Sequence, residues 1–242
     1  MIDRYVFPDI HGCIQTLQYT FEKIIHPRKT DEIYFLGDFI NKGPDSKGVL
    51  DFIFELISSG YHIQSVRGNH EQLLLNALED KNTTEEFILS GGLDTLESFH
   101  VKKVEEIPDN YIQFISKLPY YIELEDYFIV HAGFNFSSQD PFQDEVSMLT
   151  IRDYTVKPEI LNYKKIIHGH HARSLQEILY DLIEKKGYAL DIDNGCVYTN
   201  REGMGNLLVL MLNDLSYHIQ PCLDTHDYEH SVSKRRYYQN RS

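Results

Sequence analysis

Aspartate, asparagine and histidine side chains stand directly after short apolar runs at several places in this chain. The segments concerned are Asp9-Ile10-His11-Gly12, Gly37-Asp38, Gly68-Asn69-His70-Glu71, His131-Ala132-Gly133 and His168-Gly169-His170. Carboxylate oxygens, an amide oxygen and imidazole nitrogens, with no thiolate among them, suit Mn²⁺, Fe or Zn²⁺ better than a structural zinc site. The adjacent glycines allow sharp turns that bring short side chains together. Each motif alone is weak, but their combination predicts two adjacent metal ions.

The apolar runs before these segments have the length and composition of buried strands. They cover residues 5–8, 33–36, 62–67, 127–130 and 165–167. Open α/β sheets keep their sites beyond the carboxyl ends of the strands. We therefore expect the polar residues to meet at one edge of a sheet.

The chain is predicted to form a single α/β domain over residues 1–222, followed by a polar, solvated tail at 223–242. Apolar residues at helical spacing predict helices over 14–26, 46–58, 71–80 and a helical excursion at about 84–118, broken at Gly91-Gly92 and Pro108. A hairpin is expected from 120–124 and 127–130, and a loop-rich stretch over 134–163. Further strands are expected over 188–192, 195–199, 206–212 and 216–220.

The net charge of the chain restricts the classes of partner that it is expected to bind. The 242 residues carry a formal net charge of −14, which argues against binding to nucleic acid or to an anionic membrane. Metal ions can reverse the local sign of a site, so an anionic substrate remains compatible with this charge. The sequence shows no signal peptide and no stretch of membrane-spanning length, so we expect a cytoplasmic protein. The oligomeric state stays open.

Three cysteines, Cys13, Cys196 and Cys222, have no paired spacing. The odd count predicts free thiols in a reducing compartment. Cys13 directly follows Gly12, and we favour a packed small residue there over redox control. For His170, which follows the last predicted ligand His168, a pocket-lining role and a structural role are left open.

The order and spacing of the motifs resemble the phosphoprotein phosphatase branch of the calcineurin-like metallophosphoesterases, above all its small bacterial and phage members. That family carries G-D-x-H-G, G-D-x-x-D-R-G, G-N-H-E, H-A-G and G-H, and the resemblance covers roughly residues 4–212. It implies a β-sandwich of two mixed sheets flanked by helices, a four-layer αββα arrangement. It also implies a cytoplasmic hydrolase with two divalent metal ions, Mn²⁺ ahead of Fe or Zn²⁺.

The resemblance assigns a role to each matching position. Asp9, His11 and Asp38 would hold the first metal, and Asp38 would bridge to a second metal completed by Asn69, His131 and His168. A hydroxide between the metals would be the nucleophile. His70 would protonate the leaving oxygen, and Lys42, Asn69 and Arg152 would contact the phosphoryl group.

Two departures from the family pattern affect catalysis. Asn41 stands where the family has an aspartate that orients and charges the histidine corresponding to His70, and Lys42 replaces a phosphate-binding arginine. An asparagine oxygen can accept a hydrogen bond, but an amide cannot stabilise an imidazolium by charge. A lysine keeps the positive charge and loses the planar two-pronged contact. We therefore expect an enzyme that is slower than its relatives and prefers easy leaving groups.

The favoured function at this point is metal-dependent phosphomonoester hydrolysis by a serine/threonine protein phosphatase, acting on a phosphorylated protein or a small phosphoester. One alternative is hydrolysis of a dinucleoside polyphosphate or another nucleotide, with a base-binding pocket expected in the excursion. Another alternative is a low-activity or inactive scaffold that binds phosphorylated partners. The departures at Asn41 and Lys42 are compatible with this alternative.

Overall fold

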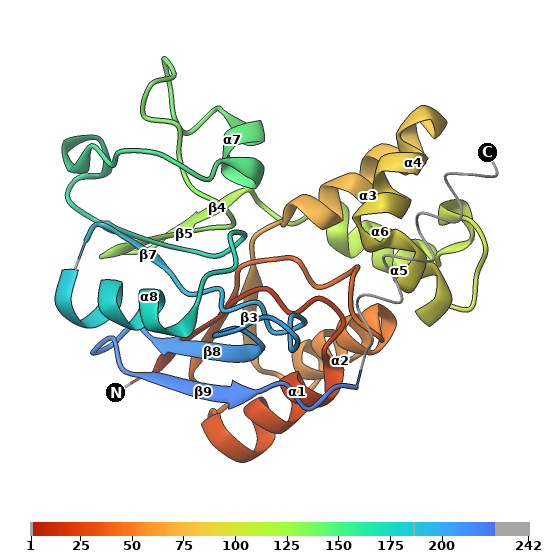
Figure 1. The fold of residues 1–242 in the computed structure, drawn as a ribbon, viewed down its shortest axis with the longest axis horizontal. Helices are drawn as coiled ribbons and strands as arrows, with labels where there is room; N and C mark the ends of the chain where they lie inside the picture. Colours follow the sequence, from red (N-terminus) through yellow and green to blue (C-terminus); the bar gives the residue numbers. More distant parts are fainter. Residues whose placement is uncertain (1, 186, 226–242) are drawn as a thin grey trace.

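Two mixed β-sheets packed face to face form the centre of the computed structural model, which describes residues 2–185 and 187–225 (Figure 1). The first sheet has the order β3-β2-β1-β8-β9. Its strands are β1 (Arg4–Phe7), β2 (Glu32–Phe35), β3 (His62–Ser65), β8 (Asn206–Met211) and β9 (Tyr217–Pro221). The second sheet has the order β4-β5-β6-β7. Its strands are β4 (Tyr121–Glu123), β5 (Tyr127–Val130), β6 (Lys165–His168) and β7 (Ala189–Asp191).

The apolar runs are continuous because the first sheet is covered on both faces. Val6 of β1 packs inside the sandwich with Ile129 and Ile167 of the second sheet. Its neighbours Tyr5 and Phe7 belong to the apolar cluster on the opposite face, among the helices. Successive strand residues point to opposite faces, so a strand buried on both sides needs apolar residues at every position.

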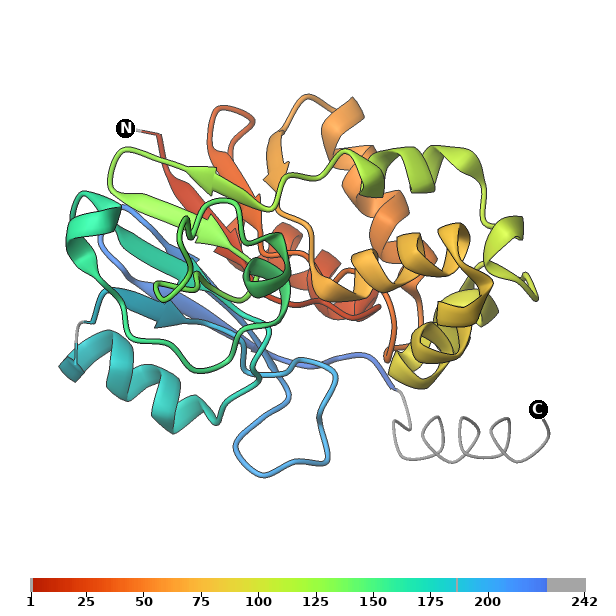
Figure 2. The same cartoon turned by 90° about the horizontal axis from the view of Figure 1, so that it is seen from above.

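Helices cover the outer face of the first sheet. α1 (Ile14–Tyr19), extended by a π-helical turn at Thr20–Ile25, and α2 (Ser46–Ser58) share one apolar cluster with β1 and β2. α3 (Asn69–Glu79) then leads into the predicted excursion, which both views place beside the sandwich (Figures 1 and 2). The excursion contains α4 (Thr84–Phe87), α5 (Leu93–Ser98) and α6 (Asp109–Ser116), with a π-helical turn at Ile88–Gly92 and 3₁₀ turns at Lys81–Thr83 and Val104–Glu106.

The outer face of the second sheet has a thinner cover. The loop-rich stretch contributes α7 (Glu145–Thr150) and a 3₁₀ turn at Pro158–Leu161, and its Phe134 packs on Phe128 of β5. α8 (Leu175–Tyr180), followed by a π-helical turn at Asp181–Lys185, adds Ile178 to the cluster inside the sandwich. The expected β-sandwich of two mixed sheets flanked by helices is confirmed. Within the described ranges, no helix is long and apolar enough to cross a membrane.

Two sequence-based expectations of local structure are wrong. Residues 195–199 form turns and no strand, because Gly195 has a φ of +63° and accepts a turn hydrogen bond from the Tyr198 amide at 2.8 Å. The strand ends that carry the polar motifs also belong to two sheets, β1, β2 and β3 to the first and β5 and β6 to the second. The motifs therefore meet at the junction of two sheets, not along one edge. Helix α8 was not anticipated.

The polar tail was expected to begin at residue 223, and residues 226–242 lie outside the described part of the chain. Asp224 is buried, in contrast to a solvated tail. Its carboxylate accepts hydrogen bonds from the amides of Gln15 and Thr16 at 3.0 and 2.9 Å. The first turn of α1 lacks a side-chain cap at Cys13, so Asp224 supplies the acceptor that a helix N-terminus needs.

Candidate metal centre

Asp38 lies between two groups of side chains that could each hold a metal ion. On one side its Oδ2 is 3.4 Å from His11 Nε2 and 3.8 Å from His70 Nε2. On the other side its Oδ1 is 3.6 Å from His131 Nε2. His170 joins this second group, with the metal-ligating atoms of each group within 4.8 Å of one another. One carboxylate facing two ligand groups is the arrangement expected of a bridging ligand.

The first group contains His11 and Asp38 of the three residues predicted for the first metal, and the third, Asp9, lies next to it. Asp9 Oδ2 lies 4.0 Å from His11 Nε2, and Asp9 and Asp38 are both almost fully buried. The Nδ1 of His11 is 2.9 Å from the backbone oxygen of Ile40. A proton on Nδ1 donates to that oxygen, which leaves the lone pair of Nε2 free to face the carboxylates.

In the second group the structure brings His170, not His168, to the other predicted ligands. His170 Nδ1 lies 2.9 Å from Asn69 Oδ1 and 3.2 Å from His131 Nε2. His168, the last residue of β6, is in neither group of the described part of the chain, and its ring lies 5.9 Å from the ring of Tyr154. The structure thus brings His170, which lies two residues after the predicted ligand His168 at a turn with a φ of +71°, to the other residues of this group.

The second group has converging acceptors that call for a cation. His131 Nδ1 donates to the backbone oxygen of Leu36 at 2.7 Å, so Nε2 of the neutral ring carries a lone pair. That lone pair faces Asn69 Oδ1, also an acceptor, at 2.9 Å. Burial lowers the pKa of His131 to about 4, so the ring is neutral at pH 7. A metal ion would relieve the contact between the two acceptors, and the residues present fit that role.

The buried acidic groups also indicate a site that binds cations. Burial raises the pKa of Asp38 and of Asp193 to about 6. The pKa of Asp9 is raised well above its usual value by burial and then by the charges of Asp193 and Asp38. Bringing three carboxyl groups together out of water disfavours their charged forms, and divalent cations would restore those charged forms.

A lysine ammonium already occupies the cation side of the first group. Lys42 Nζ lies 2.7 Å from His11 Nε2 and donates to the lone pair that a metal would use. Its charge opposes the rise in the pKa of Asp38. The structure therefore places Lys42 against a predicted metal ligand, close enough to contact a phosphoryl group bound there.

Asn41 contacts His70, as expected, but through the other end of its amide. The Thr95 hydroxyl donates to Asn41 Oδ1 at 2.6 Å, so the amide nitrogen faces His70 Nδ1, at 2.9 Å. An amide NH₂ only donates, so His70 Nδ1 accepts and the neutral ring carries its proton on Nε2. Burial, and then the charge of Lys42, lowers the pKa of His70 well below its usual value.

Glu71, which was not among the predicted site residues, holds the Asp38 loop. Its buried carboxylate accepts from the amides of Asp38 and Gly68 at 2.7 and 3.0 Å, and from those of Phe39 and Ile40 at 2.9 and 3.3 Å. Burial raises the pKa of Glu71 to about 7. Its position in the Gly68-Asn69-His70-Glu71 motif was the available signal.

Several residues of the candidate centre adopt left-handed backbone conformations. They are His11, Asp38, Asn41, Lys42 and His170, with φ between 47° and 71°. Such conformations are costly for residues other than glycine and concentrate at functional sites.

Asp193 is a further residue that sequence reasoning missed. It follows β7 and precedes Asn194-Gly195, the same strand-to-glycine pattern that identified the other motifs.

Positive charges act on both halves of the centre. The pKa of His170 is lowered by burial, by the charge of His131 and then by that of Arg152, an exposed residue two positions beyond the end of α7. On the other side, Lys42 lies over the ring of Tyr198 with Nζ 5.8 Å from the centroid, and the Arg201 guanidinium stacks 4.0 Å from the same ring. Tyr198 and Arg201 were not among the predicted site residues.

Comparison with known proteins identifies relatives of this arrangement. A family model described as calcineurin-like phosphoesterase matches residues 4–202. The symmetrical bis(5'-nucleosyl)-tetraphosphatase of Cellvibrio japonicus is 41% identical over 71 residues, which are 29% of this chain and 25% of that protein. The match thus spans about a quarter of that relative.

Longer matches at lower identity point to two activities. The asymmetrical bis(5'-nucleosyl)-tetraphosphatase of Oceanobacillus iheyensis is 24% identical over 220 residues, 81% of this chain and 85% of that protein. The serine/threonine-protein phosphatase 1 of Salmonella typhimurium is 29% identical over 136 residues, 54% of this chain and 58% of that protein. A solved structure described as a candidate diadenosine tetraphosphatase shares the fold with a TM-score of 0.67 at 23% identity, over 92% of this chain and 95% of that one.

Proposed function

Because the chain belongs to the calcineurin-like phosphoesterase family, we propose that it is a hydrolase that cleaves a phosphoanhydride bond of a dinucleoside polyphosphate with two divalent metal ions. The sequence alone favoured a protein phosphatase, with this activity as the alternative. Relatives named as tetraphosphatases, one of them matched over most of its length, support the alternative.

Asp9, His11, Asp38, Asn69, His131 and His170 would hold the metal ions, with Mn²⁺ ahead of Fe or Zn²⁺. Bound there, the ions supply water activation and neutralisation of phosphoryl charge. Asp38 spans both halves of the centre, and the contacts of His11 Nδ1 with Ile40 and of His131 Nδ1 with Leu36 fix the two rings. Lys42 and Arg152 would neutralise the phosphoryl oxygens from opposite sides.

The contact between Asn41 and His70 is the observation that carries the choice of substrate. The Asn41 amide donates to His70 Nδ1, and the pKa of His70 is lowered. A neutral His70 can donate a hydrogen bond from Nε2 but is a poor source of a proton. An alkoxide leaving from phosphoserine needs a proton, whereas a nucleotide phosphate, whose second pKa is about 6, leaves as a stable anion. This arrangement therefore suits an anhydride better than an alkyl ester.

The cations around Tyr198 add support for a long anionic substrate. The metal ions and Lys42 would be enough to neutralise the charge of a single phosphoryl group. Arg201 continues the positive charge past Lys42 on the same ring, where further phosphates of a polyphosphate chain would lie. Arginine contacts phosphate oxygens in a bidentate manner.

The test compares Mn²⁺-dependent kcat/KM on diadenosine tetraphosphate, on a phosphoserine peptide and on p-nitrophenyl phosphate, with Asp38→Asn as the inactive control. We expect turnover of the tetraphosphate and of p-nitrophenyl phosphate, and much slower turnover of the peptide. Arg201→Ala should raise KM for the tetraphosphate and leave p-nitrophenyl phosphate unchanged. Faster turnover of the peptide than of the tetraphosphate would favour a protein phosphatase instead. The similarity to the Salmonella serine/threonine-protein phosphatase supports that second function. Failure to hydrolyse any of the three with metal bound would indicate a binding scaffold.

A further inference from the structure

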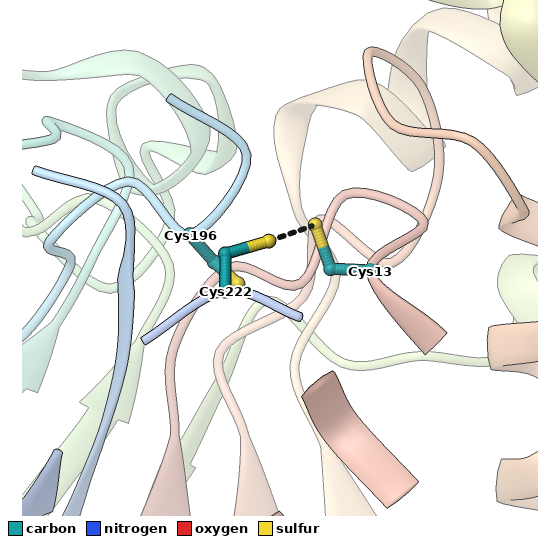
Figure 3. Close-up of side chains that lie close together, drawn as sticks. All are labelled: Cys13, Cys196 and Cys222. Carbon is teal, nitrogen blue, oxygen red and sulfur yellow. Dashed lines mark hydrogen bonds between the residues drawn. The ribbon is translucent and has the colours of Figure 1, made fainter. Parts of the chain in front are cut away.

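The three cysteines of the chain come together at one place in the structure. Their Sγ atoms all lie within 4.8 Å of one another. They come from the end of the His11 loop, the turn after β7 and the segment after β9, and the close-up shows Cys13 and Cys222 pointing toward each other (Figure 3). All three are free thiols. Spacing along the sequence gave no sign of this cluster.

The separation of the sulfur atoms matches a shared metal ion. Cys13 Sγ and Cys222 Sγ are 4.0 Å apart. Two thiolates that each bind one zinc ion at about 2.3 Å are themselves about 3.8–4.0 Å apart at tetrahedral to trigonal angles. A disulfide would need the sulfur atoms to approach to about 2.0 Å.

Hydrogen bonds fix the backbone that directly follows Cys222. The Leu223 amide donates to Thr16 Oγ1 at 2.8 Å, and that hydroxyl contacts the Asp224 carboxylate at 2.6 Å. The Thr16 hydroxyl also lies 3.6 Å from Cys222 Sγ. Cys222 is therefore held at the start of α1 before any ion binds, which lowers the entropy cost of assembling a site.

Burial leaves the cluster one route to solvent. Cys13 and Cys196 are 1% and 2% exposed, and Cys222 is partly exposed. An ion would enter on the side of Cys222 and be shielded from water by the other two thiols.

We propose that Cys13, Cys196 and Cys222 bind one thiophilic cation, Zn²⁺, in a structural site separate from the catalytic pair. Each thiol that coordinates loses its proton to solvent, and the sulfur lone pair forms the bond to the metal. Carboxylates and imidazoles make up the catalytic centre, whereas thiolates select softer ions. The ion would tie the segment after β9 to the loop that carries His11.

The test is titration of the reduced, metal-free full-length protein with Co²⁺ and with Cd²⁺, followed by ultraviolet absorption. Only thiolates give sulfur-to-metal charge-transfer bands, so the carboxylate and histidine ligands of the catalytic centre do not interfere. Once the catalytic centre is also filled, we expect the bands to saturate at an intensity that corresponds to one thiolate site per chain, and we expect them to be lost in Cys222→Ser. The His131→Ala variant, which weakens the catalytic centre, should keep them.

A second measurement does not depend on how well the variants fold. In the unaltered protein, one equivalent of Zn²⁺ beyond those bound by the catalytic centre should protect the cysteines against a thiol reagent. Absence of charge-transfer bands together with unchanged thiol reactivity would overturn the proposal. So would a 13–222 disulfide that forms with a peroxide equally fast in the presence and absence of Zn²⁺, because a bound ion would block it.

Discussion

At the scale of single residues, Asn41 decides which nitrogen of His70 carries the proton. Its amide donates to Nδ1, whereas an aspartate would accept a hydrogen bond from a protonated Nδ1 and stabilise the imidazolium by its charge. The two residues are nearly the same size, so the difference is almost entirely electrostatic. This electrostatic difference decides whether the His70 ring can donate a proton to a leaving group.

Asn41→Asp should raise turnover on alkyl phosphates most, and on aryl phosphates less. A carboxylate at residue 41 would raise the pKa of His70 and let Nε2 release a proton to the leaving oxygen. Loss of such an orienting partner costs about 10–100-fold, so the gain should approach that range. The measurement is Mn²⁺-dependent kcat on phosphoserine peptide and on p-nitrophenyl phosphate. Unchanged or lower rates on both would show that Asn41 does not limit proton transfer.

His170→Ala and His168→Ala form a matched pair that tests the second metal group. His170 contacts Asn69 and His131, and His168 contacts neither in the described structure. We expect His170→Ala to lower the affinity for the second metal ion and to cost more than the roughly 10–100-fold typical of an orienting partner. His168→Ala should leave metal content, measured by mass spectrometry, and turnover close to those of the unaltered protein. If His168→Ala lost the second metal ion and His170→Ala kept it, His168 would be the ligand, as the sequence predicted.

Most of the candidate site could be predicted from the sequence because each ligand follows an apolar strand and stands beside a glycine. The choice between His168 and His170 could not be made from strand periodicity, because residues two apart lie on the same face of a strand. The two side chains are separated only by the end of β6 at His168 and by the turn that follows it. The turn that brings His170 into the group depends on contacts with Asp9, whose Oδ1 accepts from the His170 amide at 3.3 Å.

At the scale of elements, the loops after β2 and β3 need close approach of two backbones. A Cβ on Gly68 would lie 2.1 Å from Asp38 Oδ1, and a Cβ on Gly37 would lie 2.3 Å from the Gly68 nitrogen. Glu71 then joins the same loops through its four amide contacts. The position of Asp38 therefore depends on glycines that carry no ligand themselves.

Gly68→Ala should displace Asp38 and abolish metal binding by the centre. The expected cost in folding free energy is about 1–3 kcal/mol, typical of overpacking. Gly60→Ala is the control, since a Cβ there meets nothing within 4 Å, although Gly60, unlike Gly68, has a positive φ of +87°. It should lose stability through backbone strain and keep its metal affinity. Calorimetric titration with Mn²⁺ and thermal unfolding of both variants separate the two effects; equal metal affinity in both would argue against the steric account.

Strands were easier to predict than the elements around them. Runs such as Ile33–Leu36 are apolar at every position because both faces of the sheet are covered. The turn at 195–199 contains apolar residues of strand type, and only the positive φ of Gly195 excludes a strand. Which sheet a strand joins is set by long-range pairing, which a local pattern does not encode.

At the scale of the whole molecule, an acidic chain concentrates buried carboxyl groups at one place. The net charge is −14, and the pKa values of Asp38 and Asp193 are raised to about 6. The nearby histidines have lowered pKa values, about 4 for His131. Without metal, the centre therefore takes up protons on its carboxylates well before its imidazoles.

Metal affinity should fall as pH drops below about 6. Above that pH the carboxylates are ionised and affinity is nearly constant; below it, metal must displace protons, at a loss of about tenfold per pH unit for each carboxylate involved. His131 stays neutral until about pH 4, so its protonation adds nothing in this range. Competition with a chelator for Mn²⁺ from pH 5 to 8 measures the slope. Constant affinity down to pH 5 would show that these carboxylates are already ionised without metal.

The pairing of β1 with both β2 and β8 sets the order in which the chain can fold. β1 is the central strand of its sheet, and its antiparallel neighbour β8 lies near the other end of the described sequence. During synthesis β1 presents an open edge until β8 has left the ribosome. Pairing of such distant segments slows folding, so metal-dependent activity should return late during refolding. A chain cut after residue 202, where the family match ends, would keep every proposed catalytic residue and lose β8 and β9, two of the five strands of the first sheet.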